Sequence, residues 1–309
     1  MQPLKSEDIY GTWGTVLLPV NDDQSIDYDR LAASIDTLIA SGINGIYSNG
    51  TAGEFYNQTE EEFDRISAIL AQKCTAANMP FQLGCTHISP ILSLGRLKRI
   101  KALAPGAIQV ILPDWFPPTM PEIIDYLKLM ATEAHPIKLV LYNPPHAKVK
   151  LLPQDYYEIQ RAGIELVGCK TSGGNEAWYK QMKELVPELS LFVPGHHLAT
   201  GIKMGAHGSY SNVACINPHA AQQWYKMMLT DMESAMEMQG RIQQFVTTYI
   251  FPLITEEKYS DPAIDKFLAA ITGWAHLGTR LRWPYRWVGA DKIELIRSAC
   301  KDILPEFFL

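Results

Sequence analysis

Short apolar runs and longer segments with a helical period alternate along most of the chain. The first run, residues 11–19, is largely apolar and ends at a proline, which is typical of a buried strand. In residues 27–41, apolar side chains such as Leu31 and Ile35 recur at the spacing of one helix face. The pattern therefore begins with a strand followed by a helix, and the same pair recurs.

The later units follow the same rule. Thr59 and Glu62 form a capping-box pattern, which predicts the start of the second helix. The predicted strands are 11–19, 45–48, 81–85, 107–112, 138–142, 165–170, 190–193 and 208–211. The predicted helices are 27–41, 59–73, 90–103, 121–133, 153–161, 175–185, 197–204 and 218–229.

Eight strand–helix units within about 220 residues are what a (β/α)8 barrel requires. A doubly wound sheet is the rival, but it favours fewer units, and no G-x-G-x-x-G follows the first strand. We predict an α/β fold in which residues 1–232 form a (β/α)8 TIM barrel, the catalytic domain. Residues 233–309 form a C-terminal helical extension packed on it, with helices near 234–251, 261–272 and 289–303.

Composition limits the kinds of partner that this protein can bind. The chain has 309 residues, of which 47% are hydrophobic, and a formal net charge of −6 without a basic cluster, which argues against nucleic acid. No apolar run approaches the ~20 residues that span a bilayer, and residues 1–8 lack a secretory pattern. The five cysteines are scattered and never spaced C-x-x-C, which suits free thiols in a reducing compartment. We expect a cytoplasmic protein with a small-molecule partner.

The sixth predicted strand carries the most unusual residue. It ends in Lys170 and a glycine-containing turn, and alternation places Leu166 and Lys170 on one face, with Val167 and Cys169 on the other. Burying an ammonium group is costly, and desolvation lowers the pKa of a lysine so that its free amine can attack a carbonyl. From this strand alone, a lysine that extends to solvent is the simpler alternative.

In such a barrel, chemistry takes place at the C-terminal ends of the strands. The residues predicted at this end are Thr51, Ala52, Glu54, Asp114, Trp115, Phe116, Tyr142, Lys170, Gly195, His196, His197 and Tyr210. These residues also have ordinary alternative roles. Tyr142 could be a core tyrosine and Thr51 a turn residue, and Trp115, Phe116 and Tyr210 could fill a subunit interface. Adjacent histidines do not easily share one metal, so we predict no metal site.

Three motifs on these strand ends point to a family. They are Gly50-x-x-Gly53-Glu54, Tyr142-Asn143-x-Pro145 and Gly168-x-Lys170. Their order and spacing resemble the Schiff-base aldolase family that contains dihydrodipicolinate synthase and N-acetylneuraminate lyase. The similarity extends over nearly the whole chain. It also implies a homo-oligomer, either a dimer or a homotetramer.

The resemblance implies roles for these residues. Lys170 would form an imine with a 2-oxo acid, typically pyruvate, so the covalent imine takes the place of a cofactor. Tyr142 would relay protons to the reacting oxygen, with Thr51 coupled to it, and amides at Thr51 and Ala52 would hold the carboxylate. Trp115, Gly195, His196 and Tyr210 would complete the substrate pocket. Chemically, an iminium accepts electrons from a bond that breaks beyond the neighbouring carbon.

The sequence also departs from the family pattern. Ala52 stands where members often carry a second hydroxyl, and Ala147 stands where the synthases place an arginine for the second substrate. Asp114-Trp115 replaces the paired tyrosines of their proton relay, and the histidine pair replaces acidic residues of the neuraminate lyases. These changes favour neither dihydrodipicolinate synthesis nor sialic acid cleavage.

The leading interpretation is a class I carbon–carbon or carbon–oxygen lyase, an aldolase or dehydratase. It would act on pyruvate or on a 2-keto-3-deoxy sugar-type 2-oxo acid. One alternative is condensation of pyruvate with an aldehyde, as in 4-hydroxy-tetrahydrodipicolinate synthase. A non-enzyme alternative is a silent barrel that only binds 2-oxo acids, which the intact pair of Lys170 and Tyr142 disfavours.

Overall fold

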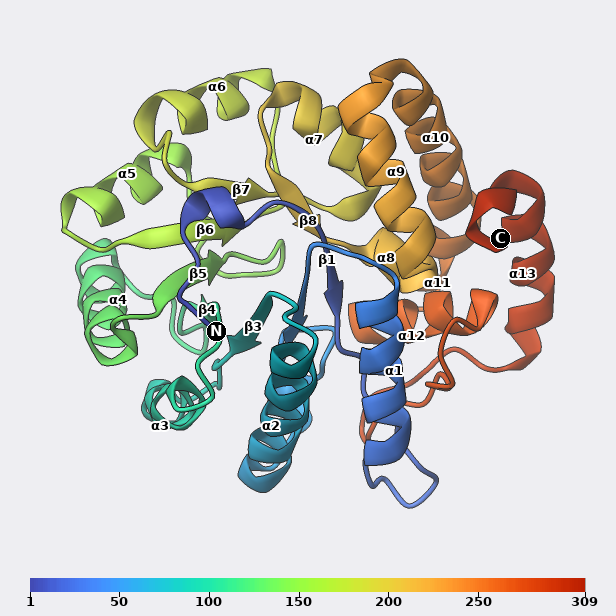
Figure 1. Ribbon diagram of the computed structural model, residues 1–309, viewed down its shortest axis with the longest axis horizontal. Helices are drawn as coiled ribbons and strands as arrows, with labels where there is room; N and C mark the ends of the chain where they lie inside the picture. The colour runs from blue at the N-terminus through green and yellow to red at the C-terminus, as the bar shows by residue number, and fades with distance from the viewer. Residues whose placement is uncertain (309) are drawn as a thin grey trace.

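Eight parallel strands close into a barrel in the computed structural model, which describes residues 1–308 (Figure 1). Each strand pairs with the next one along the chain, and the last pairs with the first. The strands are β1 (Gly11–Thr15), β2 (Gly45–Ser48), β3 (Phe81–Gly84), β4 (Ala107–Ile111), β5 (Lys138–Tyr142), β6 (Leu166–Lys170), β7 (Ser190–Phe192) and β8 (Gly208–Tyr210).

Helices surround the barrel, and further helices follow the last strand. They are α1 (Tyr28–Ala40), α2 (Glu60–Ala76), α3 (Pro90–Lys101), α4 (Met120–Ala134), α5 (Pro153–Arg161), α6 (Glu176–Leu185), α7 (Leu198–Met204), α8 (Asn212–Ile216), α9 (Pro218–Thr230), α10 (Met232–Phe245), α11 (Phe251–Thr255), α12 (Asp261–Thr272) and α13 (Asp291–Ile303). Short 3-10 or π turns are η1 (Ser6–Asp8), η2 (Phe55–Asn57), η3 (Gly195–His197), η4 (Val246–Ile250) and η5 (Pro305–Phe308). The predicted TIM barrel with C-terminal helices is confirmed.

Local signals account for several boundaries. The capping box predicted at the start of α2 is present, because the Thr59 hydroxyl accepts from the Glu62 amide and the Glu62 carboxylate accepts from the Thr59 amide. The first strand is shorter than predicted and ends at Thr15. Its neighbour β2 turns away after Ser48, so residues 17–19 have no adjacent strand to pair with.

The predicted side-chain alternation of β6 is wrong at Leu166 and Val167. Pairing with β5 advances from Leu139 opposite Leu166 to Val140 opposite Gly168, so Val167 is an extra residue in the ladder. Such a bulge reverses the alternation of side chains. Val167 therefore packs inside the barrel and Leu166 packs toward the helices, whereas Cys169 faces the helices as predicted.

The C-terminal helices lie together at one side of the barrel (orange to red in Figure 1). The helix predicted at 234–251 is interrupted, since a π turn, η4, separates α10 from α11. Turns of this kind occur often at functional sites, and Val246 and Ile250 of η4 line the main cavity. Helix α12 follows its predicted range and packs against α8 and α13.

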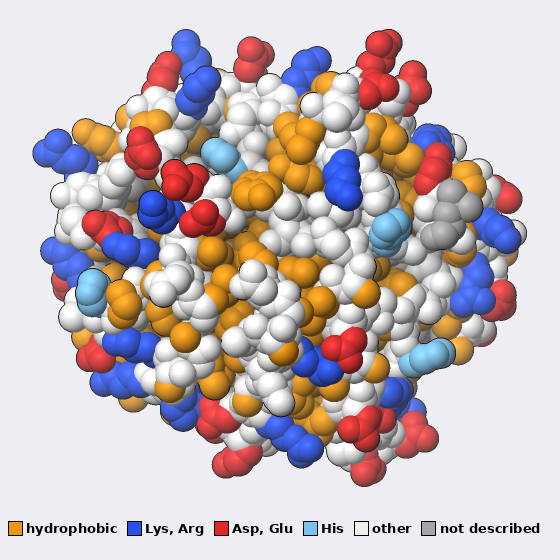
Figure 2. Space-filling view, in the orientation of Figure 1, with side chains coloured by type: hydrophobic (Ala, Val, Ile, Leu, Met, Phe, Trp, Pro, Cys, Tyr) orange, Lys and Arg blue, Asp and Glu red, His pale blue; other side chains and the backbone are white. Residues whose placement is uncertain are grey.

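The molecular surface carries no dominant charge on the face that Figure 2 shows, where acidic and basic side chains are interspersed around the rim. All five cysteines are free and buried, as predicted. Within residues 1–308, no helix has both the length and the apolarity needed to cross a membrane.

Candidate active site

A cavity of about 390 Å³ opens at the C-terminal ends of the strands, around Lys170. Strand ends form its inner part, and side chains from η4, α11 and α12 form its outer part. A larger hollow of about 740 Å³ lies at the opposite end of the barrel, between the N-terminal segment and the start of β6. Chemistry in this fold takes place at the C-terminal ends, so the Lys170 cavity is the candidate site.

Lys170 lies among aromatic rings in this cavity. Its Nζ is 4.1 Å from the ring centroid of Tyr142, 5.5 Å from that of Tyr210, and 3.3 Å from the hydroxyl of Tyr47. Burial lowers the pKa of Lys170 to about 8, although the nearby Asp265 opposes this effect. A minor but useful fraction of the amine is therefore neutral and nucleophilic near neutral pH.

Tyr142 ends β5 beside Lys170, because the two residues pair across the ladder. Burial raises the pKa of Tyr142, and a hydrogen bond with Thr51 opposes this shift. The phenol is thus a neutral hydrogen-bond donor at physiological pH. The structure brings the three predicted catalytic residues Lys170, Tyr142 and Thr51 to one cavity.

The turn after β2 places Thr51 and Ala52 on the cavity wall. In the described part of the chain, the amides of these two residues donate no hydrogen bond to the protein, so both are available to a carboxylate. Asn49 and Glu54, on either side of the turn, have left-handed backbone conformations with φ of 57° and 52°. Glu54 forms an ion pair with Lys266 of α12, at 2.5 Å and with both side chains fully buried.

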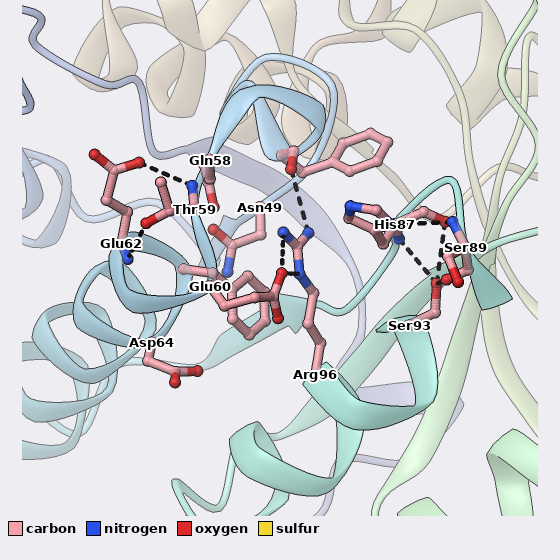
Figure 3. Close-up of polar contacts among 12 residues, drawn as sticks. Asn49, Gln58, Thr59, Glu60, Glu62, Asp64, His87, Ser89, Ser93 and Arg96 are labelled. Atoms are coloured by element: carbon pink, nitrogen blue, oxygen red, sulfur yellow. Dashed lines mark hydrogen bonds and ion pairs between the residues drawn. The ribbon is translucent and has the colours of Figure 1, made fainter. Parts of the chain in front are cut away.

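A buried arginine, Arg96, anchors the segment that follows this turn (Figure 3). The Arg96 guanidinium donates to the carbonyl of Phe55 at 3.2 Å, to the carbonyl of Thr86 at 2.7 Å, and to the Glu60 carboxylate at 2.9 Å. Its contacts join the segment after the turn to the loop after β3. The fork of a guanidinium fixes several partners at once, so Arg96 ties the segment after the Thr51 turn to the neighbouring loop.

The remaining predicted binding residues take different places. Tyr210 lines the base of the cavity, and its hydroxyl donates to Gln82 at 2.6 Å. His196 also lines the cavity, and burial, assisted by His197, lowers its pKa to about 4, so it is neutral. Gly195 is buried behind the wall, where an added Cβ would lie 2.6 Å from the hydroxyl of Ser211.

Trp115 does not line the Lys170 cavity. It is 72% exposed and lies at a second, smaller cavity of about 230 Å³, which shares Thr51 with the first. Lys148 holds the loop that carries Trp115, because its amide donates to Asp114 and its ammonium donates to the carbonyl of Trp115, both at 2.8 Å. Trp115 therefore adjoins the candidate site without entering it.

Several residues of the cavity were not predicted. Tyr47 is one, although its place near the end of β2 was a usable signal. Asp265 of α12 is another, and it belongs to a helix outside the strand–helix repeat. The outer wall comes from the same region and is mostly apolar, although Asp261 and Asp265 also lie in it; its apolar side chains are Val246, Ile250, Phe251, Ile254, Ile264 and Leu268.

No site in residues 1–308 brings together three or more His, Cys, Asp or Glu side chains in a way that would hold a metal ion. Cys215 lies in the cavity wall, but burial raises the pKa of its thiol well above the usual range. At neutral pH this thiol stays protonated, so it is a poor nucleophile.

Fold and site together define a (β/α)8 barrel with a desolvated lysine at the end of its sixth strand. Residues 8–286 match the dihydrodipicolinate synthetase family, and the chain belongs to that family. The resemblance seen in the strand-end motifs is confirmed.

Individual relatives are more distant. A 4-hydroxy-tetrahydrodipicolinate synthase from Acidobacterium capsulatum is 28% identical over 209 residues, which cover 66% of this chain and 68% of that protein. A trans-O-hydroxybenzylidenepyruvate hydratase-aldolase from Sphingobium xenophagum is 25% identical over 162 residues, or 50% of this chain and 49% of that protein. A prophage protein from E. coli K12, crystallised with pyruvate, has the same fold: its TM-score is 0.83 at 19% identity, over 96% of this chain and 98% of that one.

Proposed function

We propose that this protein is a Schiff-base lyase in which Lys170 forms an imine with pyruvate or another 2-oxo acid. The substrate would be cleaved or dehydrated beyond the carbon next to the imine, and a 2-keto-3-deoxy sugar acid belongs to this class. Membership of the dihydrodipicolinate synthetase family supports the proposal. So does the E. coli relative that was crystallised with pyruvate.

The observation that carries the proposal is the state of Lys170. Burial lowers its pKa to about 8, and within residues 1–308 no carboxylate forms an ion pair with it. A buried lysine that serves only the fold is normally paired. In the proposed roles, the amides at Thr51 and Ala52 hold the carboxylate of the 2-oxo acid. Tyr142 donates a proton to the carbonyl oxygen as it leaves.

The proposal is tested by borohydride reduction in the presence of a panel of 2-oxo acids, read by intact mass. We expect pyruvate to add one reduced pyruvyl group per chain, and Lys170→Ala to add none. If no 2-oxo acid of the panel is trapped on the parent protein, the proposed function is wrong.

A second candidate function differs from the first in the part of the substrate that is released. Six apolar side chains, from η4, α11 and α12, form most of the outer wall, and Lys170 is the only lysine or arginine among the described residues that line the cavity. Such a wall favours an apolar aldehyde over a charged one. The Sphingobium relative is named for a substrate with an aromatic ring. We infer that an arylidene- or alkylidene-pyruvate is the alternative substrate.

A comparison of substrates separates the two candidates. Benzaldehyde and glyceraldehyde are offered in turn with pyruvate, and the new carbon–carbon bond is followed by NMR. Faster condensation of benzaldehyde would support the apolar substrate, whereas faster condensation of glyceraldehyde would support the sugar acid. Aspartate semialdehyde should react slowly, because Ala147 offers its carboxylate no charged partner. The homo-oligomer and the cytoplasmic location stay predictions.

A further inference from the structure

Asp265 is an acidic residue on a helix that is otherwise mostly apolar toward the barrel. Helix α12 buries Ile264, Phe267 and Leu268 in the core. Asp265 lies one turn along the helix from the exposed Asp261 and lines the Lys170 cavity. A carboxyl group at such a position is costly to the fold, and no step of the proposed function so far uses it.

Asp265 and Lys170 share a cavity, but no ion pair joins their charged groups. The two groups line one cavity and attract each other electrostatically. Among the described residues, Lys170 nevertheless forms no ion pair, and its ammonium donates to the hydroxyl of Tyr47. A 2-oxo acid bound to the lysine would therefore lie in the cavity that Asp265 also lines.

The neighbouring residue fixes this part of α12. Lys266 forms the buried ion pair with Glu54 and donates to the carbonyl of Arg280 at 2.7 Å. The ion pair joins α12 to the turn that carries Thr51. Consequently, the expected carboxylate cradle and Asp265 are held in one frame around the lysine.

Asp265 and Tyr142 differ in whether they can accept a proton at neutral pH. Burial, and then the charge of Asp261, raises the pKa of Asp265 to about 7, so both of its forms are populated at neutral pH. Burial raises the pKa of Tyr142 far above neutrality. Its phenol is therefore protonated at neutral pH and can donate a proton, but it cannot serve as the base. A base with a pKa near the working pH is the better proton acceptor.

We propose that Asp265 is the base that moves the proton at C3 of the 2-oxo acid once its C2 is joined to Lys170, an inference that rests on the proposed function. The Asp265 carboxylate takes the C3 proton, and the C–H electron pair forms a C2–C3 double bond. The former C=N π pair moves onto Nζ, so the iminium and the carboxylate become a neutral enamine and a carboxylic acid. In the cleavage direction, Asp265 returns this proton to C3 of the enamine.

The proposal divides the proton transfers between two residues. Tyr142 serves the oxygen that leaves from C2 when the imine forms, and Asp265 serves the carbon. Imine formation is read by borohydride trapping of pyruvate. Proton transfer at C3 is read by the exchange of the pyruvate methyl protons in deuterated water, followed by NMR. Neither readout requires the natural substrate.

Asp265→Asn should therefore separate the two readouts. We expect methyl exchange to fall at least ~100-fold, while trapping stays within ~3-fold of the parent rate or rises, because the charge that opposes the low pKa of Lys170 is gone. The matched control is Glu256→Gln, which makes the same chemical change on an exposed carboxylate after α11. This control should change neither readout.

Chemical rescue of Asp265→Ala by formate distinguishes a catalytic base from a group that only supports the fold. In Asp265→Ala, added formate should restore part of the methyl exchange, because a small carboxylate can occupy the space that the side chain leaves. Parental exchange in Asp265→Asn, or an equal loss of trapping and exchange, would overturn the role of Asp265 and leave the proposed function intact. So would a failure of formate to restore exchange in a folded Asp265→Ala protein that still traps pyruvate. Absence of trapping in the parent would overturn both.

Discussion

Two desolvated lysines of this chain, one half-buried and one fully buried, lie in opposite environments. Lys266, on α12, is fully buried and forms an ion pair with Glu54 at 2.5 Å. Lys170, at the end of β6, faces a cavity lined by tyrosines, and in the described chain it has no ionic partner. Burial lowers the pKa of both side chains; the contacting Glu54 opposes this effect at Lys266, and Asp265, which forms no ion pair with the lysine, opposes it at Lys170.

The difference shows what burial alone can and cannot do. A desolvated ammonium with a carboxylate partner stays charged and links two segments, here α12 and the turn after β2. Without a contacting partner, the neutral amine becomes accessible, and the same side chain becomes a nucleophile. The environment decides between structure and chemistry, and each part of this comparison can be tested.

The largest expected effects come from replacing each lysine by methionine. Lys266→Met leaves the Glu54 carboxylate buried without a cation, which typically costs ~3–5 kcal/mol of unfolding free energy. Lys170→Met removes a desolvated amine and should leave stability nearly unchanged or higher, while all trapping of pyruvate is lost. Urea unfolding of both variants measures the contrast.

A double variant sharpens this result. Removing both charges in Glu54→Gln with Lys266→Met should recover part of the lost stability, because no unpaired ion is then buried. If Lys266→Met is as stable as Lys170→Met, the ion pair does not support the fold, and the proposed contrast fails.

The next largest expected effect comes from replacing Tyr142, which lies beside Lys170. Tyr142→Phe keeps the ring but removes the neutral donor, so we expect the rate of imine formation to fall by ~10²–10⁴. Because exchange requires the imine, trapping and methyl exchange should fall together, unlike in Asp265→Asn. Quench-flow trapping and NMR exchange provide the two rates. Parental values for both would make Tyr142 a core tyrosine.

Much of this account was predictable from the sequence, because the barrel repeats one local pattern eight times. Parallel strands place their C-terminal ends together, so Lys170, Tyr142 and Thr51 could be assigned to one site without coordinates. The bulge at Val167 could not be predicted, since an extra residue in a ladder leaves no mark on a short apolar run.

Asp265 and Lys266 were missed for a different reason. Both lie on α12, after the repeat has ended, and the period of a helix does not say which surface it packs against. Adjacent residues there take opposite roles, since one lines the cavity and the other pairs with Glu54. Only the docking of α12 on the barrel assigns them.

The smallest expected effect concerns the carboxylate cradle. Ala52→Ser adds a hydroxyl to the cavity wall, and one more hydrogen bond to the pyruvate carboxylate is worth ~0.5–1.5 kcal/mol, or roughly 2–10-fold in apparent affinity. The concentration dependence of trapping measures it. Ala52→Cys is the control of similar size with a weak donor, and an equal gain in both variants would show that the hydroxyl is not the cause.

The most direct test of the comparison maps pyruvate trapping by peptide mass at a series of pH values. Lys170 should carry the reduced pyruvyl group, and its rate of labelling should rise with pH and level off above about 8, because its pKa is lowered from 10.5 to about 8 and only the neutral amine attacks. Lys266 should stay unlabelled throughout. Labelling of Lys266, Lys148 or Lys203 in place of Lys170, or a rate that still rises steeply above pH 10, would contradict the account.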